Sequence, residues 1–178
     1  MSIFRLPFHR AALATFLCIA LAACSPSLNW REVRGSDAPY SVLLPAKPSS
    51  FTRTVDLNGL KVEMSMTGAE VDDMNFVVAS ARIADAAQRE AALSTMQQAM
   101  LRNIGAERHT DRKVTLDGGI PATEIEASGR AARDGRPLLL RARFAIHGER
   151  VYQAVALGPA AQLSPETAET FLSSFKPR

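Results

Sequence analysis

Cysteine is scarce in this chain of 178 residues, where it occurs only as Cys18 and Cys24. A domain formed by the residues after Cys24 therefore has no thiol and no disulfide, and burial of its core must hold it together. Zinc–thiolate sites, cysteine nucleophiles and dithiol redox pairs are excluded for that part of the chain.

A concentrated excess of positive charge is also missing. The chain has 21 Lys and Arg against 18 Asp and Glu, a net charge of +3. Arg5 and Arg10 fall within residues 1–23, which contain no acidic residue, so the remainder carries 19 − 18 = +1. Proteins that bind nucleic acid usually present a clustered basic face, and we expect no nucleic-acid partner.

The apolar stretch at the start of the chain is short. Residues 11–23 are apolar except for Thr15, and they follow a segment with Arg5 and Arg10. A membrane-spanning helix needs roughly 20 apolar residues. A positive segment followed by a short apolar one is typical of a secretory signal.

The end of this stretch, Leu21-Ala22-Ala23-Cys24, resembles the lipobox of bacterial lipoproteins. The resemblance implies cleavage before Cys24, acylation (palmitate) of that residue, and a cell-envelope protein held on a membrane by lipid with its domain facing the periplasm. Ser25 favours the outer over the inner membrane, since Asp at that position commonly retains such proteins in the inner one. An ordinary signal peptide with an incidental cysteine and an uncleaved anchor are the alternatives.

These observations predict three segments: a signal peptide over residues 1–23, a short tether over 24–29 and a single domain over 30–178. Cleavage would leave 178 − 23 = 155 residues, which suits one domain with a substantial core.

Alternation of apolar and polar residues predicts strands through most of the domain. The expected strands are 30–34, 40–44, 51–57, 60–67, 74–83, 108–116, 122–127, 138–147 and 151–157. Asn58-Gly59 predicts a two-residue hairpin turn. We expect a turn over 68–73, a flexible connection over 128–135, and a central, doubly covered strand over 74–83.

Two helices are predicted. The first runs from Ala86 to about Ile104, with Asp85 as its N-cap and Gly105 as its stop. The second follows Ser164, with Pro165 at the first helical position. Its apolar stripe is Phe171, Leu172 and Phe175. The element order indicates an α+β fold, a mainly antiparallel sheet packed by two helices.

Four segments together resemble small bacterial proteins of the PsbP/Mog-like α/β/α sandwich class. They are residues 40–45, the helix from Asp85, residues 116–119 and residues 171–176. The resemblance implies a protein-binding or assembly module and not an enzyme. It transfers no site residue to this chain; Cys24 comes from the lipobox alone.

Two other groups of residues could bind a metal, and each also has a simpler structural interpretation. Glu107, His109 and Asp111 alternate along one strand and can be metal ligands or a solvated face. Met64, Met66, Met96 and Met100 can bind Cu(I) or fill a core. In both cases we favour the simpler interpretation and predict no metal and no cofactor.

Two further groups concern catalysis and anion binding. Ser128, His147 and Asp134 are the residue types of a hydrolase, but nothing resembles a nucleophile elbow. Arg141, Arg143 and Arg150 can form a basic strip for an anionic lipid or partner, or simply solvated strand faces, which we favour. We therefore predict no catalytic residue.

The sequence thus predicts a lipid-anchored, non-enzymatic envelope lipoprotein whose domain binds or assembles with envelope proteins. The alternative is an envelope carrier of a small ligand or metal. A deep apolar pocket between the first helix and the sheet would favour the carrier, and a filled core would favour the binding module.

Overall fold

The computed structural model describes residues 28–178, so the predicted signal peptide, Cys24 and most of the predicted tether lie outside the described residues. The helices are α2 (Ala86–Asn103), α3 (Pro165–Ser174) and the short 3-10 helix η1 (Asp117–Gly119). The strands are β1 (Arg31–Arg34), β2 (Tyr40–Leu44), β3 (Ser49–Leu57), β4 (Leu60–Val71), β5 (Met74–Arg82), β6 (Arg108–Thr115), β7 (Pro121–Arg130), β8 (Pro137–His147), β9 (Arg150–Pro159) and β10 (Lys176–Pro177).

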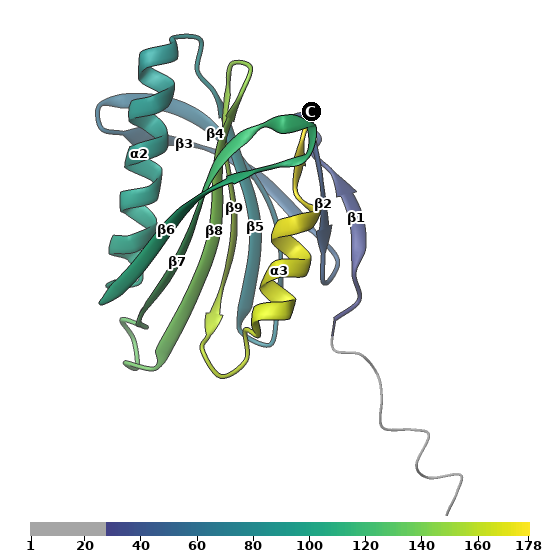
Figure 1. Ribbon diagram of the computed structural model, residues 1–178, viewed down its shortest axis with the longest axis vertical. Coiled ribbons are helices and arrows are strands. Elements are labelled where there is room, and N and C mark those ends of the chain that lie inside the picture. Colours follow the sequence, from purple (N-terminus) through teal and green to yellow (C-terminus); the bar gives the residue numbers. More distant parts are fainter. Residues whose placement is uncertain (1–27) are drawn as a thin grey trace, which may run out of the picture.

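A seven-stranded sheet forms the centre of the molecule, in the order β3-β4-β5-β9-β8-β7-β6. Every neighbouring pair in it is antiparallel. Helix α2 packs on one face, which we call the α2 face (Figure 1). Helix α3 and the small sheet β1-β2-β10 pack on the other, the α3 face. The predicted α+β class with a mainly antiparallel sheet is confirmed.

The turns explain how the long strands are connected. Asn58 and Gly59 both have positive φ, 59° and 88°, as the predicted two-residue hairpin requires. The turn expected over 68–73 is wrong, because β4 continues to Val71 and only Asp72 and Asp73, at φ 50° and 64°, reverse the chain. The expected flexible connection over 128–135 is also partly wrong, since β7 extends to Arg130.

Both helix starts are confirmed. The Asp85 side chain accepts a hydrogen bond from the Gln88 N–H at 2.9 Å, and the Ser164 side chain accepts one from the Thr167 N–H at 3.0 Å. Each cap satisfies an amide that would otherwise lack a partner in the first turn. Gly105 follows α2 with φ 53°, the left-handed conformation predicted for the stop.

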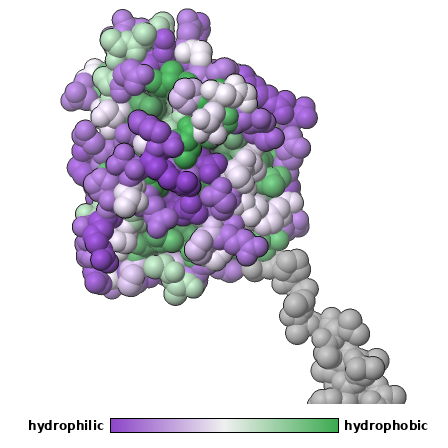
Figure 2. Space-filling model, in the orientation of Figure 1, coloured by the Kyte–Doolittle hydropathy of each residue, from purple (hydrophilic) through white to green (hydrophobic). Residues whose placement is uncertain are grey.

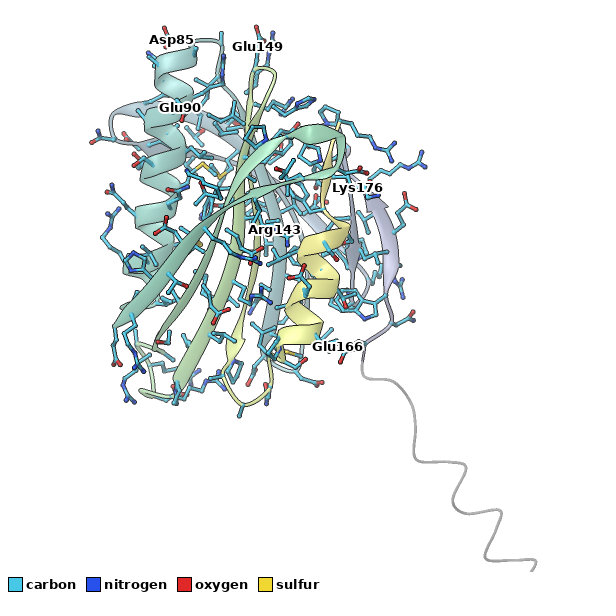
Figure 3. All side chains as sticks on the ribbon, viewed as in Figure 1. Asp85, Glu90, Arg143, Glu149, Glu166 and Lys176 are labelled. Atoms are coloured by element: carbon cyan, nitrogen blue, oxygen red, sulfur yellow. The ribbon has the colours of Figure 1, made fainter. Side chains whose placement is uncertain are left out.

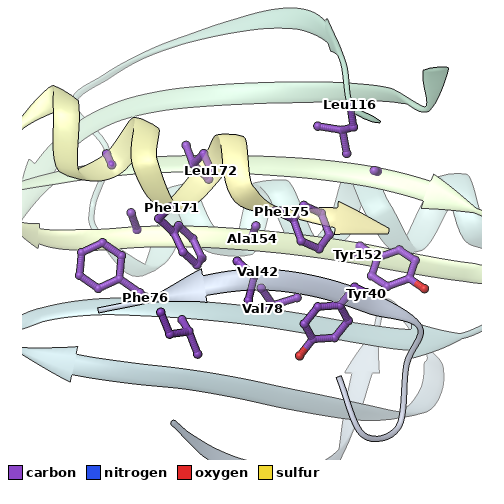
Figure 4. Close-up of a cluster of buried hydrophobic side chains, with 14 of the residues drawn as sticks. Tyr40, Val42, Phe76, Val78, Leu116, Tyr152, Ala154, Phe171, Leu172 and Phe175 are labelled. Atoms are coloured by element: carbon purple, nitrogen blue, oxygen red, sulfur yellow. The ribbon is translucent and has the colours of Figure 1, made fainter. Parts of the chain in front are cut away.

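The core has two parts, one on each face of the sheet, and β5 contributes to both as predicted for a central strand. On the α3 face, aromatic rings from four elements meet (Figure 4). Phe76 and Phe171 lie 5.5 Å apart edge to face, and Tyr40 and Tyr152 both lie 6.0 Å from Phe175. The core on the α2 face contains Phe144, Val151 and the methionines of β4 and α2.

Candidate functional site

The most concentrated group of charged side chains lies between the sheet and α3, and we call it the α3 charge cluster. Its members are Arg112 of β6, Glu124 and Glu126 of β7, Arg141 and Arg143 of β8, and Glu169 of α3. Strand alternation places them together, because each of the five sheet residues falls on the α3 face. Figure 3 shows Arg143 between the sheet and α3.

Glu124 is the centre of this cluster and is 3% exposed. Its Oε1 accepts from Arg112 at 2.6 Å and from Arg141 at 3.1 Å, and its Oε2 accepts from Arg143 Nε at 2.6 Å. Glu169 reaches down from α3 to the same two β8 arginines, at 3.3 Å and 3.0 Å. A carboxylate this deeply buried is tolerated because several guanidinium groups surround it.

The electrostatics of Glu124 combine opposing effects. Burial raises the pKa of the carboxyl, whereas hydrogen bonds from Arg112 and Arg143 and their positive charges lower it. The net result is a pKa below the ordinary value of 4.5, so Glu124 is ionised at neutral pH.

The two β8 arginines also bind the backbone of α3. Arg141 Nη1 donates to the Pro165 carbonyl at 3.2 Å, and Arg143 Nη1 donates to the Leu172 carbonyl at 2.8 Å. The second contact satisfies a carbonyl in the last turn of the helix, where cations are also favoured by the helix dipole. The arginines therefore hold both ends of α3 to the sheet.

Charge balance decides what the α3 charge cluster can do. Its three arginines and three glutamates cancel. Most of the arginine donors bond to carboxylates and helix carbonyls, and the buried Arg141 Nε, which has no hydrogen-bond partner, lies 3.3 Å from Glu126. The cluster therefore offers no surplus of one sign to a charged ligand. We therefore interpret the cluster as a structural element that holds α3 on the sheet.

The α2 face is more open, and a groove runs between α2 and the β6 side of the sheet. This groove, which we call the α2 groove, has a volume of about 360 Å³. It is lined by Glu90, Leu93, Ser94, Gln97, Gln98 and Leu101 of the helix and by His109, Asp111, Lys113, Thr123 and Ile125 of the sheet.

A neighbouring depression of about 370 Å³ continues the α2 groove across β7 and β8. The two share Glu90, Leu93, Lys113 and Thr123. The exposed lining of the α2 groove is mostly polar and carries charges of both signs, and the half-buried Leu93 adds apolar surface beside the buried Ile125. A mostly polar, mixed-charge lining with some apolar surface fits a polypeptide segment better than a strongly charged ligand.

The residues considered for a metal site are not brought together. Glu107 precedes β6 and forms an ion pair with Arg130 at 3.0 Å, while His109 and Asp111 line the α2 groove. Within residues 28–178 no group of three His, Cys, Asp or Glu is arranged to hold a metal ion.

The methionines pack as core residues, as the simpler interpretation predicted. Met64, Met66 and Met96 are buried in the α2-face core, and Met100 packs against it. They fill the space beneath α2 that a deep pocket would occupy.

The three hydrolase-type residues lie far apart. Ser128 of β7 is opposite Leu139 of β8, whereas His147 lies eight residues further along β8. At about 3.3 Å per residue this separation is roughly 26 Å. Asp134 is in the β7–β8 turn, where it pairs with Arg136.

The predicted arginine strip requires a correction. Arg141 and Arg143 were expected on a solvated strand face, but their side chains are only 10% and 11% exposed because α3 covers them. Arg150 is separate from them and donates to the Asp37 carbonyl at 2.7 Å. No basic strip forms.

No helix within the described residues is long and apolar enough to cross a membrane.

Comparison with known proteins gives little further identification. No family model matches the chain, and no curated protein matches it. One similar solved structure is PA94, a Pseudomonas aeruginosa protein of unknown function named as a candidate regulator. The match has 15% identity and a TM-score of 0.43, and covers 84% of this chain and 98% of that one.

Proposed function

We propose that this protein is a lipid-anchored envelope lipoprotein, not an enzyme, whose domain binds an extended segment of another envelope protein in the α2 groove. The lipobox Leu21-Ala22-Ala23-Cys24 supports the anchor. Periplasmic exposure and the outer membrane follow from the signal and from Ser25. The finer fold assignment, a PsbP/Mog-like sandwich, belongs to the same proposal and is supported by the helix–sheet–helix layering.

The observation that carries the binding function is the shape of the α2 groove. Its helix side extends from Glu90 to Leu101, about 17 Å at 1.5 Å per residue. That length matches roughly five residues of extended chain.

The alternative, an envelope carrier of a small ligand or metal, is less well supported. A carrier pocket is concave and mostly apolar, with a few converging polar groups. Beneath α2 that volume is filled by Met64, Met66, Met96 and Phe144. The α2 groove is instead lined mostly by polar groups of both the helix and the sheet.

The anchor and the groove are tested in one strain background. Fatty-acid labelling of the full chain should be lost in Cys24→Ser, and equal labelling of both proteins would contradict the anchor. A photo-crosslinking residue at Gln97, which lines the groove, should give a discrete adduct in intact cells. The same residue at Ala91, an exposed α2 position outside the groove, is the matched control.

A second change makes the groove test specific. Leu93→Glu places a charge on the apolar part of the groove lining and should abolish the Gln97 adduct while leaving the anchor in place. Identical adducts from Gln97 and Ala91, or an adduct that survives Leu93→Glu, would contradict binding in the groove. A small molecule released from purified protein on denaturation would favour the carrier instead.

A further inference from the structure

Strand β3 is a long exposed edge of the seven-stranded sheet. It is nine residues long and is the terminal strand next to β4. Its first six residues, Ser49–Thr54, are all exposed. Phe51, which is 56% exposed, is the one large exposed hydrophobic side chain in the described part of the chain.

The hairpin geometry shows which backbone groups of β3 face outward. Leu57 and Leu60 close the two-residue turn as a hydrogen-bonded pair, and such pairs alternate along an antiparallel ladder. Arg53 and the other odd-numbered residues therefore bond to β4. The even-numbered residues Ser50, Thr52, Thr54 and Asp56 direct their N–H and C=O groups away from the sheet.

The opposite edge of the sheet, β6, is protected in a way that β3 is not. Four of its eight residues are charged, Arg108, Asp111, Arg112 and Lys113. Figure 2, viewed with β6 in front, shows hydrophilic residues gathered over the middle of this side. β3 has two charges in nine residues and is otherwise rich in Ser and Thr. Charged side chains are a common means of preventing edge pairing, and β3 largely lacks them.

We propose that β3 pairs antiparallel with β3 of a second copy of this chain, across a two-fold axis at Thr52. Two seven-stranded sheets would then form one continuous sheet. The inference concerns a surface separate from the α2 groove and does not depend on the lipid anchor.

Side-chain complementarity favours this occupant and this register. A two-fold axis perpendicular to the sheet places Thr52 opposite Thr52 of the second copy. The same axis places Phe51 of each copy opposite Arg53 of the other, so this pair forms two times. The exposed ring is then covered by an arginine stem and guanidinium, a favourable cross-strand pair. An axis at Arg53 would instead place two arginines directly opposite, which is destabilising.

The pairing is expected to be weak in dilute solution. One strand edge buries little surface, at the low end of interface sizes. If both copies are anchored to one membrane, as proposed above, their local concentration rises and favours the pair. The solution experiments that follow do not need the anchor, so their failure and that of the lipoprotein proposal are distinguishable.

Disulfide trapping tests the register. The fragment 26–178 has no cysteine, so an introduced thiol is the only one. It contains both parts of the core, and we expect it to fold without the anchor. In Thr52→Cys the paired Cα atoms lie about 5.5 Å apart, within disulfide range. In Thr54→Cys they lie roughly 14 Å apart. On oxidation, the yield of covalent dimer should be at least tenfold higher for Thr52→Cys than for Thr54→Cys. Equal yields would overturn the pairing.

Proline substitution tests the outward amides. Thr52→Pro removes an N–H that faces away from β4, which an edge strand tolerates. It should abolish self-association in sedimentation equilibrium at up to about 1 mM, where an interaction of ~4 kcal/mol is half associated. Thr52→Val should retain it, and Arg53→Pro is the control that damages the β4 ladder and lowers the melting temperature. A wild type that stays monomeric, or a dimer unchanged in Thr52→Pro, would overturn the proposal.

Discussion

The two helices pack on opposite faces of one sheet, but they are held very differently. Helix α3 is short, ten residues, yet Ala168, Phe171 and Leu172 are buried and two arginines bind its carbonyls. Helix α2 has eighteen residues, of which only Ala92 and Met96 are buried. The longer helix is the more loosely covered, and the open groove lies beside it. The comparison teaches that α3 is held firmly to its face of the sheet, whereas the looser contact of α2 leaves part of its face available for binding.

The largest effect is expected from Phe171, which is fully buried on the α3 face. Phe171→Ala removes an aromatic contact with Phe76 and leaves a cavity. Such changes destabilise proteins by roughly 3–5 kcal/mol, so we expect about 4 kcal/mol less free energy of unfolding. Thr170→Ala, one position earlier, should change it little. Denaturant titration measures both variants. An unfolding midpoint of Phe171→Ala equal to that of the wild type would mean that α3 is not a core element.

The α3 charge cluster gives the next largest effect. Glu124→Gln removes the buried carboxylate and leaves Arg141 and Arg143 without their main counter-ion. Removing one partner of a buried ion pair destabilises a protein by about 3–5 kcal/mol. Because Glu169 still neutralises part of the arginine charge, we expect the free energy of unfolding to fall by roughly 3 kcal/mol. Glu126→Gln is the control, because Glu126 is 57% exposed. Equal effects in urea titrations of the two variants would contradict a buried, central Glu124.

On the α2 face the corresponding substitutions should matter less. Met96→Ala removes one of the two buried α2 side chains and should lower the free energy of unfolding by about 2 kcal/mol. Leu93→Ala, in the half-exposed groove lining, should change it by less than about 1 kcal/mol. If calorimetry ranks Met96→Ala above Phe171→Ala, the proposed division between the faces is wrong.

The smallest effect expected is a dependence on acid pH. The pKa of folded Glu124 is below its unfolded value of 4.5, because the arginine contacts outweigh burial. Its contribution to stability is therefore complete above pH 4.5 and is lost as the pH falls through the folded pKa. Glu124→Gln should flatten the fall in stability as the pH drops below about 4.5. A variant with the same acid dependence as the wild type would show that other carboxylates cause it.

Local features of the fold could be predicted from the sequence because they depend on neighbouring residues. Asp85 and Ser164 capped their helices, and Asn58-Gly59 formed its turn, as expected. β10 was not predicted, because its two residues form a strand only by pairing with β2. β4 was predicted too short, because its last residues alternate less clearly yet pair with β5 up to Val71.

The α3 charge cluster was missed for a specific reason. Glu124 is opposite Arg143, and Glu126 is opposite Arg141, in the β7–β8 register. The sequence contains a signal for this pairing. Two glutamates two residues apart come before the β7–β8 turn, and two arginines with the same spacing come after it. A flexible connection over 128–135 ends the two predicted strands too early for this register to be recognised. The contribution of Glu169 and the position of the α2 groove depend on how the helices lie on the sheet, which no local pattern specifies.

Native-state hydrogen exchange on the fragment 26–178 tests the central contrast between the two faces most directly. The later amides of α3 should open only with global unfolding, with protection equal to that of β8 and β9, because buried rings and arginines hold the helix. The amides of α2, apart from those near Ala92 and Met96, should exchange through smaller local openings. Protection in α3 that is equal to or lower than that in α2 would contradict the account.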